Sequence, residues 1–254
     1  MNGERVSGAP AATNVGGAVS EDKSGAAELR RIREYYRRRQ RDVPARRYSQ
    51  LSPAYAFQSS ELKQQIARLL ARKNAIPFAK CRILDVGCGD GRWLRAFVEL
   101  GAEPRNLAGI DLLPERISAA KESSPRQICL RCGDASRLPF GDGSFDILAS
   151  LTVFSSILDR GIRESIAAEM MRVLQPDGFI LWYDFFVSHP LNRDVRGISS
   201  SEIKKLFPRT RINLARVTLA PPISRMIAWN HTLLKTVSGI RLLRTHHLGT
   251  IEKQ

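Results

Sequence analysis

The chain has 254 residues, of which 43% are hydrophobic and 26% charged, and its 40 Lys and Arg residues against 25 Asp and Glu give a formal charge of +15. This composition excludes collagen-like, mucin-like and wholly disordered chains, and the length suits one large α/β domain or two small ones. There is no apolar run long enough to span a bilayer, no signal-peptide core and only four cysteines, so we expect a cytoplasmic protein without disulfides.

The positive charge is unevenly distributed along the chain. Residues 1–29 carry −2 and residues 30–47 carry +7, whereas residues 48–191 carry +1 and residues 192–254 carry +9. A uniformly basic fold would suggest a nucleic-acid platform. A neutral middle between basic flanks instead predicts that an anionic partner binds near a site whose own ligand is of a different kind.

The N-terminal part divides into a tail and a helical extension. Residues 1–28 are rich in Gly, Ala and Ser without apolar periodicity, which predicts a disordered tail. Residues 29–79 are expected to form a basic helical extension and cap. Its first helix should cover about residues 28–40, and its second should follow Ser60 as N-cap and end near Asn74.

From residue 80 to residue 254 the pattern is that of one α/β domain. Short β-type runs alternate with helical patterns, and this alternation predicts a parallel sheet with right-handed crossovers. The expected strands cover residues 82–86, 107–111, 127–132, 145–151, 179–186, 211–219 and 246–251. The expected helices cover residues 92–100, 114–122, 161–174 and 200–207, and residues 221–243 form an amphipathic insertion.

A glycine-rich turn at residues 87–91 follows the first expected strand and opens a helix. Its glycines let the backbone approach a ligand closely, at a place where helix amides point outward. The dinucleotide fingerprint requires a third glycine at the position of Arg92, so a nicotinamide cofactor is disfavoured. By itself this turn also fits a tight strand-to-helix connection without a ligand.

Acidic residues stand at the ends of the next two strands. Asp111 ends the second strand, where a carboxylate can accept hydrogen bonds from both hydroxyls of a ribose. Asp134 follows the third strand and can accept a hydrogen bond from an adenine amine. Together with Asp85 before the glycine turn, these acids predict a nucleoside-shaped site at the carboxyl edge of the sheet.

These residues resemble the class I S-adenosylmethionine-dependent methyltransferases of the small-molecule group. The resemblance covers about residues 82–186, and includes the opening Asp85-Val86-Gly87-Cys88-Gly89 and the later signature at residues 169–178. It implies S-adenosylmethionine as cofactor. It also implies a Rossmann-like, seven-stranded, mostly parallel sheet whose last strand is antiparallel, with helices on both faces.

The resemblance further assigns cofactor contacts to individual residues. Asp85 would hold the methionine ammonium through water, and Asp111 would take the ribose hydroxyls. The other contacts would come from Gly87 and Gly89 beneath the methionine part, Leu112 behind the adenine, Asp134 and the Ala135 amide at the adenine edge, and Leu151 beside the methionine part.

Candidate bases follow the fifth strand. Asp184 or His189 can accept a proton from an acceptor hydroxyl, although Asp184 also fits a cap or ion-pair partner and His189 a surface-loop residue. Cys129 and Cys132 have no second pair at ligand spacing, so no metal site is expected.

The acceptor is predicted only by class. The tail around residues 191–198 and 243–249 resembles bacterial methyltransferases associated with glycan assembly, which implies a sugar hydroxyl on a phosphate-bearing or lipid-linked carrier. Arg clusters at 37–47 and 193–196 would then bind phosphate, or else form a solvated face. Carbon methylation of a quinone-like lipid is the first alternative.

Two further alternatives remain. An RNA or DNA methyltransferase anchored by the basic N-terminal segment is disfavoured, because the fourth strand lacks both an Asn/Asp-Pro-Pro-aromatic signature and a Cys nucleophile. A cofactor-binding module without catalysis is the other.

The insertion at 221–243 is expected to pack on the sheet. Its alternatives are to cover the acceptor site or to contact an anionic membrane peripherally, such as the inner membrane surface.

Overall fold

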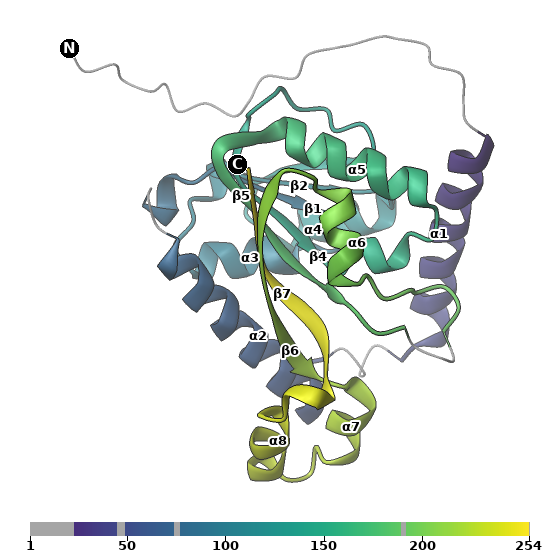
Figure 1. Cartoon of the computed structure of the whole chain (residues 1–254), viewed down its shortest axis with the longest axis vertical. Helices are drawn as coiled ribbons and strands as arrows, with labels where there is room; N and C mark the ends of the chain where they lie inside the picture. The colour runs from purple at the N-terminus through teal and green to yellow at the C-terminus, as the bar shows by residue number, and fades with distance from the viewer. Residues whose placement is uncertain (1–22, 45–48, 74–76, 189–191, 254) are drawn as a thin grey trace.

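The computed structural model describes residues 23–44, 49–73, 77–188 and 192–253, in which a central sheet lies between two layers of helices (Figure 1). In the sheet the seven strands follow the order β3-β2-β1-β4-β5-β7-β6. The strands are β1 (Ile83–Val86), β2 (Leu107–Asp111), β3 (Cys129–Cys132), β4 (Phe145–Leu151), β5 (Leu174–Phe185), β6 (Thr210–Leu219) and β7 (Arg244–Lys253).

Two long helices precede the first strand, and shorter helices connect the strands. The α-helices are α1 (Lys23–Asp42), α2 (Pro53–Arg72), α3 (Arg92–Glu99), α4 (Pro114–Ser123), α5 (Arg160–Val173), α6 (Ser200–Leu206), α7 (Pro221–Met226) and α8 (His231–Ser238). Short 3₁₀ turns are η2 (Phe78–Lys80), η3 (Pro104–Asn106), η4 (Phe154–Ser156) and η5 (Arg241–Leu243).

The predicted fold class is confirmed. Strands β1 to β5 pair in parallel, and β7 inserts antiparallel between β5 and β6. The central strands β1, β2 and β4 are buried along almost their whole length, which explains why they read as short apolar runs rather than as alternating patterns. The carboxyl ends of β1 to β5 therefore meet at one edge of the sheet.

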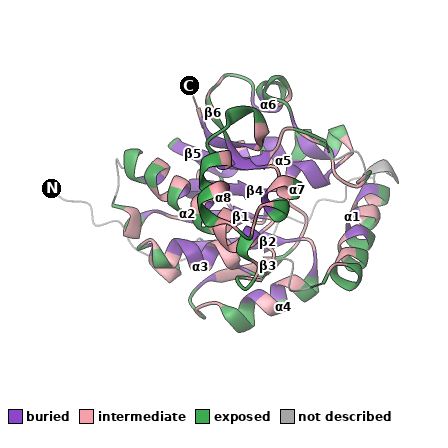
Figure 2. Ribbon diagram, turned by 90° about the horizontal axis from the view of Figure 1, so that it is seen from below, coloured by how far each residue is buried: buried purple, intermediate pink, exposed green. Residues whose placement is uncertain are grey.

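Two hydrophobic clusters lie on the two faces of the sheet, and each joins the sheet to one layer of helices. Ile66 of α2, Leu94 of α3 and Ile117 of α4 pack with one face of the sheet. Ile32 of α1 and Met170 of α5 pack with the other face, together with α6. Figure 2 views this arrangement from the end at which α7 and α8 project, with the helices arranged around the sheet.

Helix α1 begins earlier than the sequence predicts. Residues 23–28, which we assign to the disordered tail from their composition, form the first turns of α1, and residues 1–22 lie outside the described part of the chain. The reason is a tertiary anchor: the buried Glu28 carboxylate accepts the Leu158 amide at 2.5 Å and pairs with Arg31 at 2.8 Å. These contacts offset the poor helix propensity of the preceding segment.

Helix α2 also begins earlier than predicted. Its N-cap position is Ser52 and Pro53 occupies the first turn, so the predicted cap, Ser60, lies inside the helix and is exposed. Proline suits the first turn because the amide that it lacks has no partner there. The additional turns carry Gln58, whose side-chain amide donates to the Leu219 carbonyl at 2.7 Å and to Ser224 Oγ at 2.9 Å.

Strand β5 is longer than expected, and the insertion consists of three short helical segments. Strand β5 begins at Leu174 rather than near residue 179, and its pairing with β4 shifts register between Phe145 and Ile147. Residues 221–243 form α7, α8 and η5, which lie beyond the end of β6 in Figure 1.

Strand β7 lies between β5 and β6, and its close approach to the β6 backbone predicts that position 249 must be glycine. A Cβ atom there would lie 1.8 Å from the Asn213 carbonyl oxygen of β6, so backbone would have to move. We expect Gly249→Ala to lower the free energy of unfolding by about 3 kcal/mol or more. In the control Gly141→Ala, the nearest atom is Ser144 Oγ at 3.5 Å, and a change within about 1 kcal/mol is expected. Equal denaturant midpoints for the two variants would contradict this account.

Candidate functional site

The glycine turn after β1 forms the floor of the candidate site. Gly87, Gly89 and Gly91 have φ angles of 72°, 56° and 76°, which side-chain-bearing residues rarely adopt. The Gly87 amide donates to the Ile110 carbonyl at 2.8 Å, which fixes the turn against β2. A Cβ atom on Gly87 would lie 2.7 Å from Val153 Cγ2, so the turn and the residues after β4 approach each other as closely as a bare backbone permits.

Asp85 is a buried carboxylate beside this turn. It is 1% exposed, and its Oδ2 atom has no hydrogen-bond partner. Burial, with the negative charges of Asp111 and Asp90, raises its pKa well above the ordinary value. An unpaired buried acceptor is costly unless a donor or cation reaches it. Asp85 therefore fits the ammonium group of a methionine, as the resemblance implies, and that role remains a prediction.

Asp111 links the glycine turn to the next helix. Its Oδ2 atom accepts the Gly89 amide at 2.9 Å, and its Oδ1 atom accepts the Leu113 amide at 3.0 Å. Each carboxylate oxygen can accept a second hydrogen bond, so these contacts leave capacity for two ribose hydroxyls. The Arg116 guanidinium lies 4.0 Å from Oδ2 and keeps a positive charge beside the carboxylate.

The structure brings all eight predicted cofactor residues to one edge of the sheet. They lie at or just after the carboxyl ends of β1, β2, β3 and β4, which are consecutive neighbours in the sheet. Leu112 and Ala135 are half-buried and Leu151 is buried. Asp134 accepts the Ser136 amide at 2.8 Å, so its carboxylate also holds its own turn. Their contacts with the cofactor remain predictions.

The two predicted bases have different outcomes. Asp184 is 1% exposed; its Oδ2 accepts the Ser155 amide at 3.1 Å and its Oδ1 accepts the Phe185 amide at 2.8 Å. Burial raises its pKa to about 6, although these hydrogen bonds favour the charged form. The carboxylate thus positions η4, and catalysis by it stays a prediction. His189 lies outside the described residues.

Helix α1 reaches the candidate site, which sequence spacing did not reveal. The Tyr36 hydroxyl lies 2.7 Å from Ser156 Oγ, and Arg31 donates to the Ser156 carbonyl at 2.6 Å. The Arg116 guanidinium stacks 4.2 Å from the Tyr36 ring centroid, and also neighbours Asp111. An N-terminal helix therefore covers the side of the site that is predicted to bind ribose.

Tyr183, at the end of β5, is a second feature that the sequence does not signal. The Thr152 amide donates to the Tyr183 carbonyl at 2.7 Å, and Thr218 Oγ1 lies 3.0 Å from the Tyr183 hydroxyl. Both threonines have left-handed backbone, with φ angles of 64° and 61°, which is rare for a β-branched residue and costs about 1 to 3 kcal/mol. Such strain concentrates at functional sites, and here it surrounds one tyrosine at the edge beside β4.

Arginines of both predicted phosphate-binding clusters form internal ion pairs. Arg38 of the first cluster lies 3.2 Å from a carboxylate oxygen of Asp194, and Arg196 of the second pairs with Glu202. Arg31, which precedes the first cluster, also lies 3.2 Å from Asp194. Residues 45–47 of the first cluster lie outside the described ranges. The two pairs with Asp194 join α1 to the segment after β5, so part of the basic flank has a structural role.

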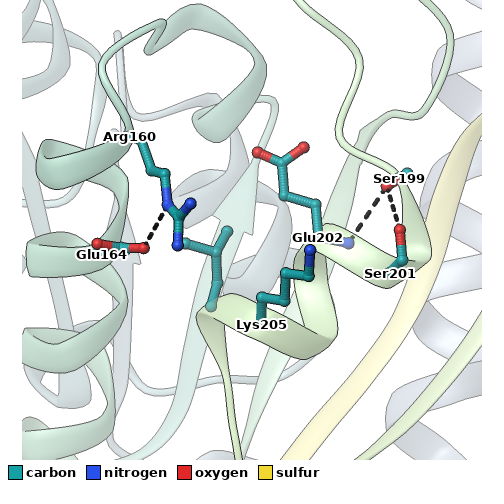
Figure 3. Close-up of a pocket in the computed structure, with 7 residues that line it drawn as sticks. Arg160, Glu164, Ser199, Ser201, Glu202 and Lys205 are labelled. Atoms are coloured by element: carbon teal, nitrogen blue, oxygen red, sulfur yellow. Dashed lines mark hydrogen bonds and ion pairs between the residues drawn. The ribbon is translucent and has the colours of Figure 1, made fainter.

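A separate cavity of about 240 Å³ lies between α5 and α6 (Figure 3). It is lined by charged side chains that include Arg160, Glu164 and Lys205, which lie on these two helices. None of its lining residues belongs to the glycine turn or to the ends of β1 to β4, so it is distinct from the candidate site.

The described residues lack a metal-binding cluster and a membrane-spanning helix. In those ranges no three or more His, Cys, Asp or Glu residues are grouped so that they could hold a metal ion. Nor does any helix there combine the length and apolar character that crossing a membrane requires.

Comparisons with known proteins agree with this geometry. A family described as a methyltransferase domain matches residues 84–182. Over 106 residues, 41% of this chain and 31% of the relative, the chain is 32% identical to a 2-methyl-6-phytyl-1,4-hydroquinone methyltransferase of Synechocystis. Over 146 residues, 54% of this chain and 58% of the relative, it is 28% identical to a demethylmenaquinone methyltransferase of Deinococcus radiodurans.

A solved structure supports the same fold. An S-adenosylmethionine-dependent methyltransferase of Mesorhizobium loti superposes with a TM-score of 0.53 at 18% identity, covering 74% of this chain and 98% of that one. At this identity the likeness concerns the fold alone. The chain covers less than two thirds of the length of each of these two relatives.

The contacts of Asp111 predict that its loss weakens cofactor binding. We expect Asp111→Ala to remove charge-assisted hydrogen bonds worth roughly 2 to 4 kcal/mol, and so to weaken S-adenosylmethionine binding about 30-fold to 1000-fold. Calorimetric titration measures this, and the exposed Asp177→Ala serves as control. Unchanged affinity in Asp111→Ala would remove the ribose assignment.

The raised pKa of Asp184 predicts a pH-dependent stability. Because the folded protein holds this proton more tightly than the unfolded chain, the contribution of Asp184 is full below pH about 4 and is lost as the pH rises through about 6. Its size over this window is about 3 kcal/mol. The free energy of unfolding of the wild type minus that of Asp184→Asn should fall by this amount between pH 4 and 7. A difference independent of pH would show that the group titrates normally.

Proposed function

We propose that this chain is an S-adenosylmethionine-dependent methyltransferase and that it methylates a ring carbon of a hydroquinone-type acceptor carried by a lipid; the methyltransferase-domain match over residues 84–182 supports the first part. The observation that carries the proposal is the burial of Asp184: it is only 1% exposed, and its carboxylate is turned toward the backbone amides of Ser155 and Phe185. An acceptor that ionises readily therefore suits this site better than one that needs a strong base. The hydroquinone and menaquinone substrates in the names of the two relatives support the same class.

The cofactor would be held by the residues at the strand ends. The unpaired Oδ2 of Asp85 suits its ammonium group, and Asp111 suits its ribose. Beside Gly89, where an added Cβ atom would meet only Arg116 at 3.5 Å, there is room for its methionine part. When bound, S-adenosylmethionine supplies a methyl group on a positively charged sulfur, which is a good leaving group.

The remaining task of the protein is to orient the acceptor and to control its proton. A phenolic hydroxyl loses its proton at a pKa near 10, as tyrosine does, whereas an aliphatic sugar hydroxyl holds its proton much more tightly. Loss of that proton raises the electron density on the ring carbons. Leu151 and Tyr183, near the ends of β4 and β5, belong to one hydrophobic cluster, beside which the acceptor ring would be oriented.

A sugar hydroxyl on a phosphate-bearing or lipid-linked carrier is the second candidate. It is favoured by the exposed arginines of α1, among them Arg30, Arg33 and Arg37, on a helix that borders the site. Guanidinium groups suit phosphate because they can donate two parallel hydrogen bonds. This candidate needs a base for the hydroxyl, which is why it ranks second.

Methyl transfer from labelled S-adenosylmethionine tests the proposal directly. Three acceptors are offered separately: a prenylated hydroquinone, a lipid-linked sugar and a mixed nucleic-acid fraction. We expect label in the hydroquinone, attached to carbon, with loss of most activity in Asp111→Ala. The oxidised quinone is the matched control and should stay unlabelled, because it has no hydroxyl to ionise.

The other outcomes separate the alternatives. Label only in the lipid-linked sugar would replace the proposal by the second candidate. Label only in the nucleic acid would contradict both, and should then decrease steeply with salt. Cofactor binding without label in any fraction would favour a binding module.

A further inference from the structure

The α7–α8 tip, defined as residues 221–243, exposes an unusual amount of apolar surface. Met226 is 70% exposed, Trp229 78%, Ile240 46% and Leu242 85%. These are four of the six large hydrophobic side chains that are exposed in the described part of the chain, and they fall within 17 residues. Single exposed hydrophobic residues are ordinary, but a cluster of this kind marks an interaction surface.

The tip is anchored to the fold by its opposite side, so the exposure is not caused by poor packing. Ser224 is fully buried, and its hydroxyl accepts from Gln58 of α2 at 2.9 Å. Leu234 is 1% exposed, and Asn230 caps α8 by accepting the Leu233 amide at 3.0 Å. The Ala220 amide donates to the Leu243 carbonyl at 2.8 Å and closes the base of the tip.

The charge around this apolar surface has one sign. Arg225, Lys235 and Arg241 are exposed on the tip, which contains no acidic residue. Between Glu202 and Glu252 the chain carries nine Lys and Arg residues and no Asp or Glu. An apolar patch whose own segment carries only basic charged residues is complementary to a surface that is apolar beneath a negatively charged layer.

The tip also stands at the carboxyl edge of the sheet. It follows directly after Thr218 and Leu219, and Thr218 contacts the Tyr183 hydroxyl at the end of β5. Figure 1 shows α7 and α8 projecting past the end of β6, and Figure 2 shows exposed residues on their outer side. A surface bound by the tip would therefore lie close to the acceptor side of the site.

We propose that the α7–α8 tip docks the protein peripherally on an anionic lipid bilayer, with Trp229, Met226 and Leu242 inserted at the level of the head groups and Arg225 and Arg241 on lipid phosphates. Tryptophan prefers this level of a bilayer because its ring is both apolar and able to donate a hydrogen bond. Helices as short as α7 and α8 lie in the interface rather than across it.

Flotation with vesicles tests this docking without any methyl acceptor. Vesicles of phosphatidylcholine are compared with vesicles that also contain phosphatidylglycerol, and we expect binding to the second kind, weakened by salt. The double variant Trp229→Ser, Leu242→Ser should lose at least about tenfold in partitioning, because two apolar side chains no longer leave water. The matched control is Val187→Ser, a 46% exposed residue outside the tip, and should bind as the wild type does.

The basic face of α1 provides the rival explanation for vesicle binding. If the Ser double variant retains its binding, α1 or another basic segment is responsible and the proposal fails. Arg225→Gln with Arg241→Gln should weaken binding, whereas Lys121→Gln with Lys204→Gln, both exposed outside the tip, should leave it near wild type. Absence of wild-type binding to both vesicle kinds also overturns the proposal.

Tryptophan fluorescence gives a second measurement that does not depend on the stability of a variant. Trp182 is 1% exposed and Trp93 is half-buried, so Trp229 should dominate any blue shift or quenching by brominated lipid in the wild type. A wild-type spectrum unchanged by bound vesicles would contradict insertion of Trp229. Failure here would leave the hydroquinone assay unaffected, and failure of that assay would not alter vesicle binding.

Discussion

The candidate site depends above all on the carboxylate of Asp111. It accepts amides from the glycine turn after β1 and from the start of α4, and so it joins two loops that belong to different strands. Because β1 and β2 pair in register, these loops are already neighbours, and the carboxylate only has to fix their spacing. The glycine turn, with Val153 packed against Gly87, and the unpaired oxygen of Asp85 then lie at the same edge of the sheet.

The basic residues of the two flanks lie in different parts of the folded protein and make different contacts. Arg31 and Arg38 of α1 pair with Asp194 after β5, so part of the excess charge closes the edge of the sheet. Outward-facing arginines of α1 remain beside the site and suit an anionic carrier. Arg225, Lys235 and Arg241 of the C-terminal flank lie on the α7–α8 tip, which also carries the exposed apolar residues. The neutral middle of the chain forms the edge with the glycine turn, and parts of both basic flanks lie beside that edge.

Much of the fold was predictable because local pattern and tertiary structure agree. The strands around residues 83–86, 107–111 and 145–151 are short, apolar and bounded by glycine or acidic residues, and the structure places them as expected. Errors arose where a distant contact decides a local boundary. Helix α1 starts at Lys23 because Glu28 binds the Leu158 amide, 130 residues away. No window of sequence contains both partners of such contacts.

By itself, the sequence determined that these acids and glycines would meet at one edge of the sheet, since they stand at fixed offsets from strand ends and parallel pairing aligns those ends. Only the tertiary structure decided what surrounds that edge. It placed Tyr36 over Arg116, bound the carboxylate of Asp184 to backbone amides, and gathered Thr152 and Thr218 around Tyr183. These arrangements join segments more than 25 residues apart, and pairing over such separations follows from packing rather than from periodicity.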